Sequence, residues 1–193
     1  MKKIFTILSL TCSCLYLSTA MAQNRYRDQN IAVGMGGITG KKGYFISLGY
    51  QQIVGFQGWN IKLDGIYANQ YVKISNDIPL ESKLPMQHYM ILPSALYTFD
   101  QWGLDPFYFN LYGGAMLGYE VLNNGKKVLT NSNLESENIK NSFIYGISLG
   151  TIIEAELTRN LTLGVDARQL YRRGSKAGEF TFYLGAGIRY YIN

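Results

Sequence analysis

The feature that most constrains the fold of this chain is an alternation of apolar and polar side chains at every second residue. In residues 142–155 the apolar set comprises Phe143, Tyr145, Ile147, Leu149, Thr151, Ile153 and Ala155. The intervening positions are Ile144, Gly146, Ser148, Gly150, Ile152 and Glu154. Because successive side chains of a β-strand point to opposite faces, this pattern predicts a strand. It is much longer than the roughly five or six residues of an average strand in a soluble protein.

The same alternation recurs along most of the chain. It is clear in residues 106–120, 161–170 and 182–192, where Gly, small polar or charged residues oppose an apolar face. It is weaker in residues 31–39, 43–54, 58–69 and 86–99. Residues 71–74 extend the third of these segments, and the fourth is apolar on both faces and interrupted by Pro93. The sequence therefore predicts about eight strands and no long amphipathic helix.

Aromatic content indicates which face of these strands points outward. Aromatic residues lie at the ends of the apolar faces, and the chain has 16 Tyr, 9 Phe and 21 Gly but only 4 Pro. Barrels that span a membrane carry aromatic girdles around an apolar outer band and turn Gly, polar and charged residues inward. We therefore predict an all-β fold, a small antiparallel up-and-down β-barrel of the outer-membrane type with about eight strands. A soluble β-sandwich or lipocalin-like barrel is the alternative, since both share this composition.

The connections between the predicted strands agree with this topology. In an outer-membrane barrel whose two ends face the periplasm, short turns alternate with longer outward loops. Segments 55–57, 100–105 and 158–160 are short, whereas segments 75–85, 121–141 and 172–179 are longer and more polar. Residues 40–42 are the exception, because this connection is short where a longer loop is expected.

The N-terminus has the pattern of a secretory signal. A basic start with Lys2 and Lys3 is followed by an uncharged apolar run and by the small residues Ala20-Met21-Ala22. This predicts a signal peptide over residues 1–22, cleaved after Ala22, and a single barrel domain over residues 23–193. The chain's 2 cysteines, Cys12 and Cys14, both lie in the signal, and acylation of one of them in a lipoprotein is the alternative.

Seven charged residues fall on the strand faces predicted to line the barrel interior: Lys62, Asp64, Glu120, Glu154, Asp166, Arg168 and Arg189. Buried charges are costly unless they are paired, so we predict a structural ion-pair network that fills a narrow lumen. A pore or a catalytic site is the alternative. A separate candidate interaction surface is the loop 121–141, with Lys126, Lys127, Glu135, Glu137 and Lys140, whose alternative interpretation is a mobile, solvated loop.

Motifs associated with catalysis or cofactors do not meet their required contexts. Residues 146–150 read G-I-S-L-G, but a G-x-S-x-G nucleophile needs a tight strand-to-helix turn. His88 is the single histidine, which excludes a multi-histidine zinc site, and we expect it to be structural or solvent-facing at a strand end. Residues 36–42 lack the first Gly and the final Ser or Thr of a phosphate-binding loop. We predict no catalytic residues, no metal site and no cofactor.

The charge balance is mild. The formal net charge is +5, and removal of Lys2 and Lys3 with the signal leaves +3. There is no basic stripe, so we predict no direct contact with nucleic acid.

Several short motifs, taken in order, resemble a known family. They are I-P-L-E-S at 78–82, L-Y-G-G-A-M-L-G-Y-E at 111–120 followed by V-L-N-N-G-K-K-V-L, S-F-I-Y-G at 142–146, residues 154–157, T-R-N-L at 158–161, and L-G-A-G-I-R at 184–189. Together they resemble the TraO family of conjugative-transposon proteins of Bacteroidetes. The resemblance covers about the last two-thirds of the chain well and the whole length in outline.

This resemblance implies a structural outer-membrane component of a conjugative mating apparatus. Its partners would be the lipid of the outer membrane and other proteins of the apparatus, and it implies no catalytic residues. Two other functions remain open from the residues. One is a general small outer-membrane barrel used for surface binding or adhesion through loops 121–141 and 75–85. The other is a barrel enzyme acting on lipid or peptide, with Ser148 and His88 as its candidates.

Overall fold

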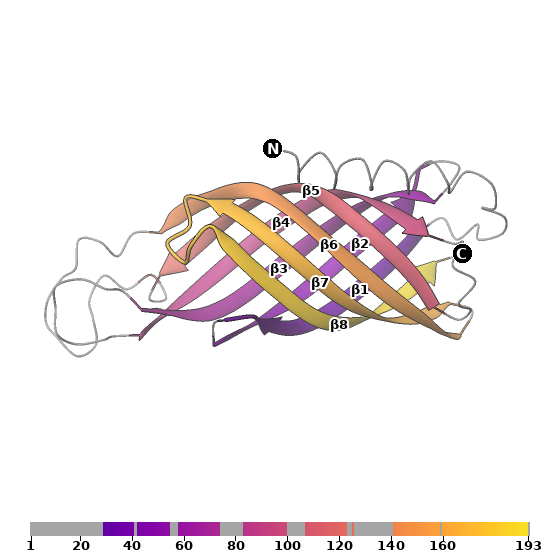
Figure 1. The fold of residues 1–193 in the computed structure, drawn as a ribbon, viewed down its shortest axis with the longest axis horizontal. Helices are drawn as coiled ribbons and strands as arrows, with labels where there is room; N and C mark the ends of the chain where they lie inside the picture. The colour runs from indigo at the N-terminus through magenta and orange to yellow at the C-terminus, as the bar shows by residue number, and fades with distance from the viewer. Residues whose placement is uncertain are drawn as a thin grey trace, which may run out of the picture.

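The computed structural model describes residues 29–40, 42–54, 58–73, 83–99, 107–122, 125, 141–158 and 160–192. The predicted signal peptide and the charged residues of loop 121–141 lie outside these residues. Eight strands form one closed barrel (Figure 1). They are β1 (Gln29–Ile38), β2 (Gly43–Ile53), β3 (Trp59–Lys73), β4 (Lys83–Phe99), β5 (Phe107–Leu122), β6 (Ser142–Thr158), β7 (Leu161–Arg173) and β8 (Phe180–Ile192). The predicted fold is thereby confirmed. The described residues contain no helix long and apolar enough to cross a membrane.

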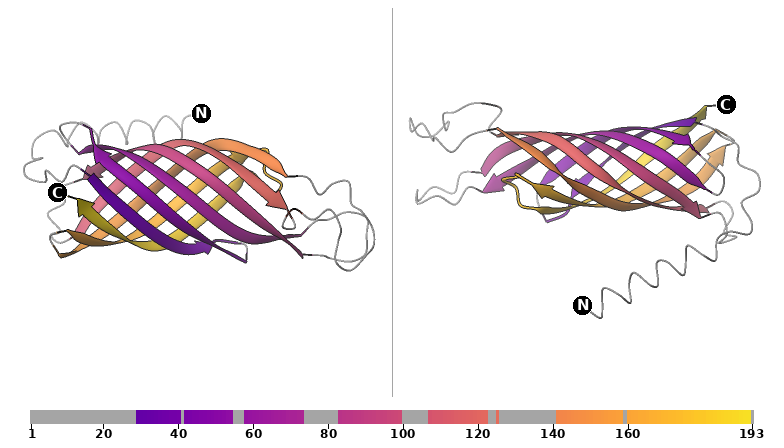
Figure 2. Two further views of the ribbon diagram at one scale, coloured as in Figure 1. Left: turned by 180° about the vertical axis from the view of Figure 1, so that it is seen from behind. Right: turned by 90° about the horizontal axis from the view of Figure 1, so that it is seen from above.

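Each strand pairs antiparallel with its neighbour along the chain, and β1 closes the barrel against β8. The closing pairs run from Gln29↔Ile192 to Ile38↔Tyr183. A closed barrel leaves no strand edge unpaired, which satisfies the backbone hydrogen bonds even where no water is available. Figure 2 shows the tilted strands continuing around the back and top of the barrel. We call the end where β1 begins and β8 finishes the terminal end, and the opposite end the loop end.

The outer face of the barrel is an apolar band. On β5, for example, Leu111 and Leu117 are 43% and 51% exposed, whereas Tyr112 and Met116 between them are buried inside. Aromatic residues flank this band, with Phe109 toward the terminal end and Tyr119 toward the loop end. Ten residues of a strand tilted by about 40° span about 25 Å along the barrel axis, which is the height of the apolar band of membrane barrels.

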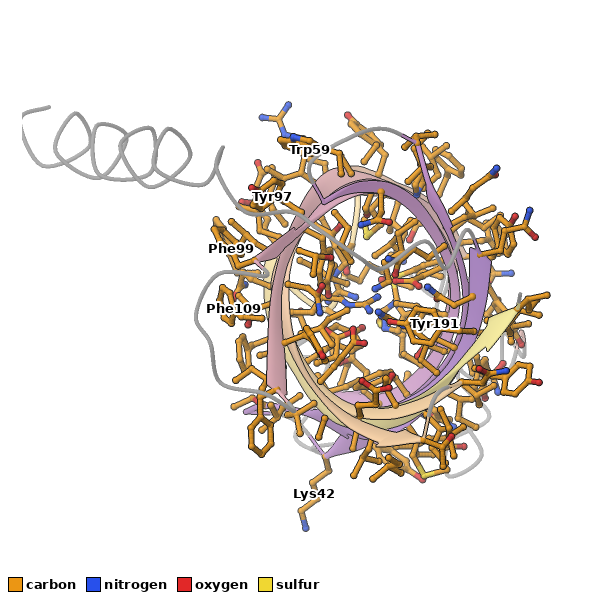
Figure 3. The ribbon with its side chains drawn as sticks, turned by 90° about the vertical axis from the view of Figure 1, so that its right-hand side faces the viewer. Lys42, Trp59, Tyr97, Phe99, Phe109 and Tyr191 are labelled. Carbon is orange, nitrogen blue, oxygen red and sulfur yellow. The ribbon has the colours of Figure 1, made fainter. Side chains whose placement is uncertain are left out.

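Aromatic rings form a continuous row at the terminal end over β3, β4 and β5. The ring centroids of Trp59 and Tyr97 are 5.1 Å apart, those of Tyr97 and Phe99 4.8 Å, and those of Phe99 and Phe109 5.5 Å. Figure 3, viewed along the barrel, shows these four residues on the outside of the wall and Tyr191 pointing inward. A second group of rings lies toward the loop end, where Tyr67 is 6.4 Å from Tyr44 and 5.4 Å from Tyr89. The two groups have the positions of interfacial girdles.

Pro93 does not end β4, although the sequence indicated an interruption there. Pro93 pairs with Leu63 of β3, so the strand continues on that side. On the β5 side, the pairing reaches Ile91↔Leu117 and resumes at Ser94↔Gly114, so Leu92 and Pro93 have no partner in the ladder. Proline has no N–H to donate, and this explains a local gap on one side of an otherwise continuous strand.

Candidate functional site

Polar and charged side chains fill the barrel interior in three groups along its axis. Of the seven charged residues expected inside, six are buried, with exposed fractions between 1% and 6%, and the Asp166 side chain is 20% exposed. The structure divides these seven residues among a central group, a terminal-end group and a loop-end group. Each group also includes residues that were not predicted from the sequence.

The central group contains two acids and two bases from β3 and β7. Lys62 Nζ lies 2.8 Å from Asp64 Oδ2, and Arg168 Nη2 lies 3.1 Å from the same oxygen. Arg168 also forms an ion pair with Asp166 on its own strand. The four formal charges cancel. Because each charge has an opposite charge in contact, their burial costs much less than that of isolated ions.

Tyr112 of β5 completes the central group. Its hydroxyl donates a hydrogen bond of 2.6 Å to Asp166 Oδ1, and its ring lies 4.2 Å from Lys62 Nζ, measured to the ring centroid. The ring crosses Gly150 of β6, where an added Cβ would lie 2.4 Å from the tyrosine hydroxyl. This residue was not predicted from the sequence. A signal for its inward position was present in the sequence, because Tyr112 is an aromatic residue on the face of β5 that otherwise carries Asn110, Gly114 and Glu120.

The terminal-end group is built around Glu154 of β6, which forms an ion pair with Arg189 of β8. The carboxylate also accepts hydrogen bonds from Asn110 Nδ2 at 2.9 Å, Thr162 Oγ1 at 3.2 Å and the Tyr191 hydroxyl at 3.3 Å. One buried carboxylate therefore links strands β5, β6, β7 and β8. Hydrogen bonds from neutral donors complement the single cation and leave the group electrically neutral.

The loop-end group contains Glu120, His88 and Arg172. His88 is fully buried within β4, so it is neither solvent-facing nor at a strand end. Its Nδ1 lies 3.3 Å from Glu120 Oε2 and 3.3 Å from Arg172 Nη1. Arg172 was expected in a loop, but β7 extends to Arg173 and turns Arg172 into the interior. The periodicity of residues 161–170 continues through Arg172, and this was the missed signal.

Glu120 also holds the segment that follows β7. Its carboxylate accepts hydrogen bonds from Ser175 Oγ at 2.7 Å and from the backbone N–H of Lys176 at 2.9 Å. Next to this contact, Ala177 is buried against Leu84, Met86 and Leu122. The segment 174–179 therefore folds over the loop end of the barrel, and one face of it is part of the interior packing.

An apolar layer separates the central and loop-end groups. It contains Phe45, Met90, Leu92, Met116, Ile144, Leu170 and Tyr183, together with Ile38, Ile66 and Ala68. The Phe45 ring lies against two glycines, since an added Cβ at Gly36 or Gly185 would come within 2.7 Å of it. The alternation in the sequence predicted glycine, small polar or charged residues on the inner faces, and not an apolar layer. Its members come from all eight strands and form one cluster, which only the barrel geometry brings about.

A cavity of about 480 Å³, which includes space open to solvent, lies beside the central and terminal-end groups. Its lining includes the charged residues Asp64, Glu154, Arg168 and Arg189 and the glycines Gly34, Gly49, Gly185 and Gly187. Nε of Arg168 and Nε of Arg189 have no hydrogen-bond partner in the protein. Since the surrounding charges are paired, water is the natural partner for these donors.

The interior does not have the geometry of the enzyme sites that the sequence raised. Ser148 lies in the middle of β6, fully buried, rather than on a turn between a strand and a helix. Within the described residues, no group of three His, Cys, Asp or Glu side chains could hold a metal ion. The arrangement can fix strands to one another and can bind water, and both are structural properties.

Solved structures share this fold at low sequence identity. A major outer membrane protein from Thermus thermophilus aligns with a TM-score of 0.60 at 15% identity, covering 86% of this chain and 98% of that one. The N-terminal β-barrel domain of Pseudomonas aeruginosa OprF aligns with a TM-score of 0.51 at 12% identity, covering 85% and 98%. Neisserial surface protein A gives 0.50 at 17% identity, covering 86% and 95%. These similarities establish the fold alone.

The sequence itself matches no curated protein. The family model described as conjugative transposon protein TraO matches residues 41–192, which run from the turn after β1 through β8 and include all three polar groups of the interior. The resemblance seen in the short motifs thus extends over most of the chain, and this protein belongs to the TraO family of conjugative transposon proteins.

Proposed function

We propose that this protein is a non-catalytic structural component of the outer-membrane part of a conjugative DNA-transfer apparatus. The observation that carries the proposal is the family match over residues 41–192. The outer face supports an outer-membrane location, because an apolar band of about 25 Å between two aromatic girdles fits a bilayer. In this orientation the terminal end faces the periplasm and the loop end faces outward.

The filled interior favours a scaffold over a conduit for DNA. The apolar layer around Met116 and Leu170 draws residues from all eight strands, and Ala177 of the 174–179 segment packs against interior residues at the loop end. Eight-stranded barrels in general have interiors just wide enough for side chains. In this proposal the charged groups are a structural network that fixes the strands, and DNA passes elsewhere in the apparatus. Contacts with other apparatus proteins would then use the ends or the outer wall of the barrel, including loop 121–141.

The decisive experiment is mating frequency from a donor carrying an in-frame deletion of the gene, with and without the wild-type gene in trans. A large drop that the restored copy reverses is the expected result. Unchanged transfer would refute the proposal and would favour a general surface barrel acting through its loops. A second complementing copy with Lys126, Lys127 and Lys140 changed to Ala, compared at equal protein level in the outer membrane, tests the loop. The loop is a contact if this copy fails to restore transfer.

The remaining parts of the proposal need separate measurements. Planar-bilayer recordings on the purified barrel should show no steady conductance, and a stable open channel would contradict the scaffold role. Membrane fractionation tests the location. The mass of the purified protein tests cleavage after Ala22 against acylation of Cys12 or Cys14.

A further inference from the structure

The outer face of β7 carries a row of polar side chains where neighbouring strands carry apolar ones. Gln169 and Arg173 are exposed and Tyr171 between them is half-buried. Gln169 pairs across the sheet with Leu149 on β6 and with Phe182 on β8, so an amide lies between two large apolar side chains. Polar groups on the lipid face of a barrel are unfavourable unless they lie near the interface or have a polar partner.

Arg173 forms the loop-end tip of this row and is surrounded by aromatic residues. It pairs across the sheet with Tyr145, and Tyr171 lies two residues before it on the same outward face of β7. The Tyr171 ring lies 5.0 Å from that of Phe180. Among the side chains that the structure describes, Arg173 is the one cation on the outward face of a strand. Its guanidinium therefore lies at the level of the loop-end girdle, next to two tyrosines.

We propose that Arg173, Tyr145, Tyr171 and Gln169 form a binding site for a lipid with an anionic, phosphate-bearing head group. From the loop end inward, the outer face of β7 presents a cation, then an amide, then apolar side chains. Such a lipid presents a phosphate, then a carbonyl, then acyl chains in the same order. The phosphate meets the guanidinium fork of Arg173 and the hydroxyl of Tyr145, which are the donors that suit phosphate oxygens. The carbonyl of an ester or amide linkage meets the Gln169 amide, whose donor in the protein alone is directed to the adjacent Leu170 carbonyl at 3.4 Å.

The acyl chains continue along the apolar band below Gln169. There the outward residues of β7 are Ala167 and Val165, and Leu184 and Ala186 stand opposite them on β8. The small side chains of Ala167 and Ala186 leave a shallow strip of wall beside Leu184. An anionic lipid thus satisfies the cation, the amide and the apolar wall together, whereas a soluble anion would satisfy the cation alone.

The lipid site rests on membrane insertion, which is part of the proposed function. The site also predicts a preference for anionic lipid, which insertion alone does not predict. The test uses the mature protein purified in detergent and mixed with equal amounts of phosphatidylglycerol and phosphatidylcholine, with retained lipid counted by native mass spectrometry. Wild-type protein should retain phosphatidylglycerol preferentially. Arg173→Gln should lower that preference about fivefold, the change expected for one cation at an anionic surface.

The matched control is Lys42→Gln, which removes an exposed cation from the β1–β2 turn, where the side chain points away from the wall (Figure 3). This variant should keep the wild-type preference. Gln169→Leu should keep the preference for phosphatidylglycerol but lose any preference for its ester-linked form over its ether-linked form, which lacks the carbonyl. If Arg173→Gln does not fold, Tyr145→Phe tests the same site through the loss of one hydroxyl.

Three outcomes would overturn the site. They are equal lipid retention by wild type and Arg173→Gln, an equal loss in Lys42→Gln, and displacement of phosphatidylglycerol by the same concentration of inorganic phosphate. The first two remove the role of Arg173, and the third shows a phosphate site without lipid recognition. Fractionation of each variant reports insertion independently, so failure of the lipid site and failure of the membrane location are distinguishable.

Discussion

The hydroxyl of Tyr112 on β5 donates a 2.6 Å hydrogen bond to Asp166 on β7, and the ring passes over Gly150 of the intervening strand β6. This bond joins two strands that are not neighbours in the sheet. It also directs Asp166 toward Arg168, with which the carboxylate forms an ion pair. The positions of Tyr112 on β5, Gly150 on β6 and Asp166 on β7 therefore constrain one another.

Tyr112→Phe tests the hydrogen bond alone, because the ring is kept. We expect the free energy of unfolding to fall by about 1.5 to 3 kcal/mol, the usual range for a hydrogen bond to a charged group. Urea unfolding in lipid vesicles measures it. Tyr119→Phe is the matched control on the same strand, since Tyr119 is 46% exposed on the outer face. Equal stability of the two variants would show that the Tyr112 hydroxyl contributes nothing.

Gly150→Ala tests the space beneath the tyrosine ring. The new Cβ would lie 2.5 Å from Tyr112 Cζ and 2.8 Å from the backbone oxygen of Ala167, so the ring or the strand must move. We expect a loss of about 1 to 3 kcal/mol, as for other overpacked interiors. Gly37→Ala, where the nearest atom is 4.0 Å from the added Cβ, should change stability much less. The idea fails if Gly150→Ala is as stable as this control.

Glu154→Gln keeps the size of the side chain but leaves the buried Arg189 guanidinium without its counter-charge. Removing one partner of a buried ion pair typically costs about 3 to 5 kcal/mol. We expect a loss in this range by urea unfolding, with folded protein still detectable by its heat-modifiable migration on gels. Glu156→Gln, two residues along the same strand and less buried, should cost well under half as much. Similar losses in both variants would argue against a special role for the Glu154 cluster.

Met116→Ala tests the apolar layer inside the barrel. Met116 is fully buried, and its truncation should leave a cavity and cost about 2 to 5 kcal/mol. The adjacent Leu117 is 51% exposed on the outer face, where lipid can fill the space, so Leu117→Ala should cost less. Thermal unfolding in the same detergent compares the two. A larger loss for Leu117→Ala would mean that the lumen is not packed as a core.

The strands were predictable because their signal is local. The alternation in residues 142–155 marks both faces of β6 without knowledge of any other strand, and so it also assigned Glu154 and Ile152 to the interior. Phe182 and Arg189 were placed on opposite faces of β8 in the same way. The short continuation of β7 to Arg173 was missed because a strand's end depends on pairing with its neighbour as well as on its own pattern.

The partners inside the barrel were not predictable from the sequence. The stagger and curvature of the sheet bring Arg189 against Glu154 and place His88 between Glu120 and Arg172. These properties belong to the closed barrel and not to any one strand. The apolar layer was not predicted for a related reason. Met116 and Leu170 are apolar exceptions on otherwise polar strand faces, and only the closed barrel shows that they belong to one cluster.

Closure of β1 against β8 also has a consequence for biosynthesis. The pairing Gln29↔Ile192 joins the first and last described strands, so its contacts form only when nearly the whole chain is available. Contacts between residues so distant in sequence are slow to form, because the loop that they close is long. Until then the nascent sheet presents two unpaired edges that can recruit other chains. A cell that exports this protein must therefore keep the unclosed intermediate soluble. Pairing of β1 with β8 is the last step, and it decides whether the barrel is completed.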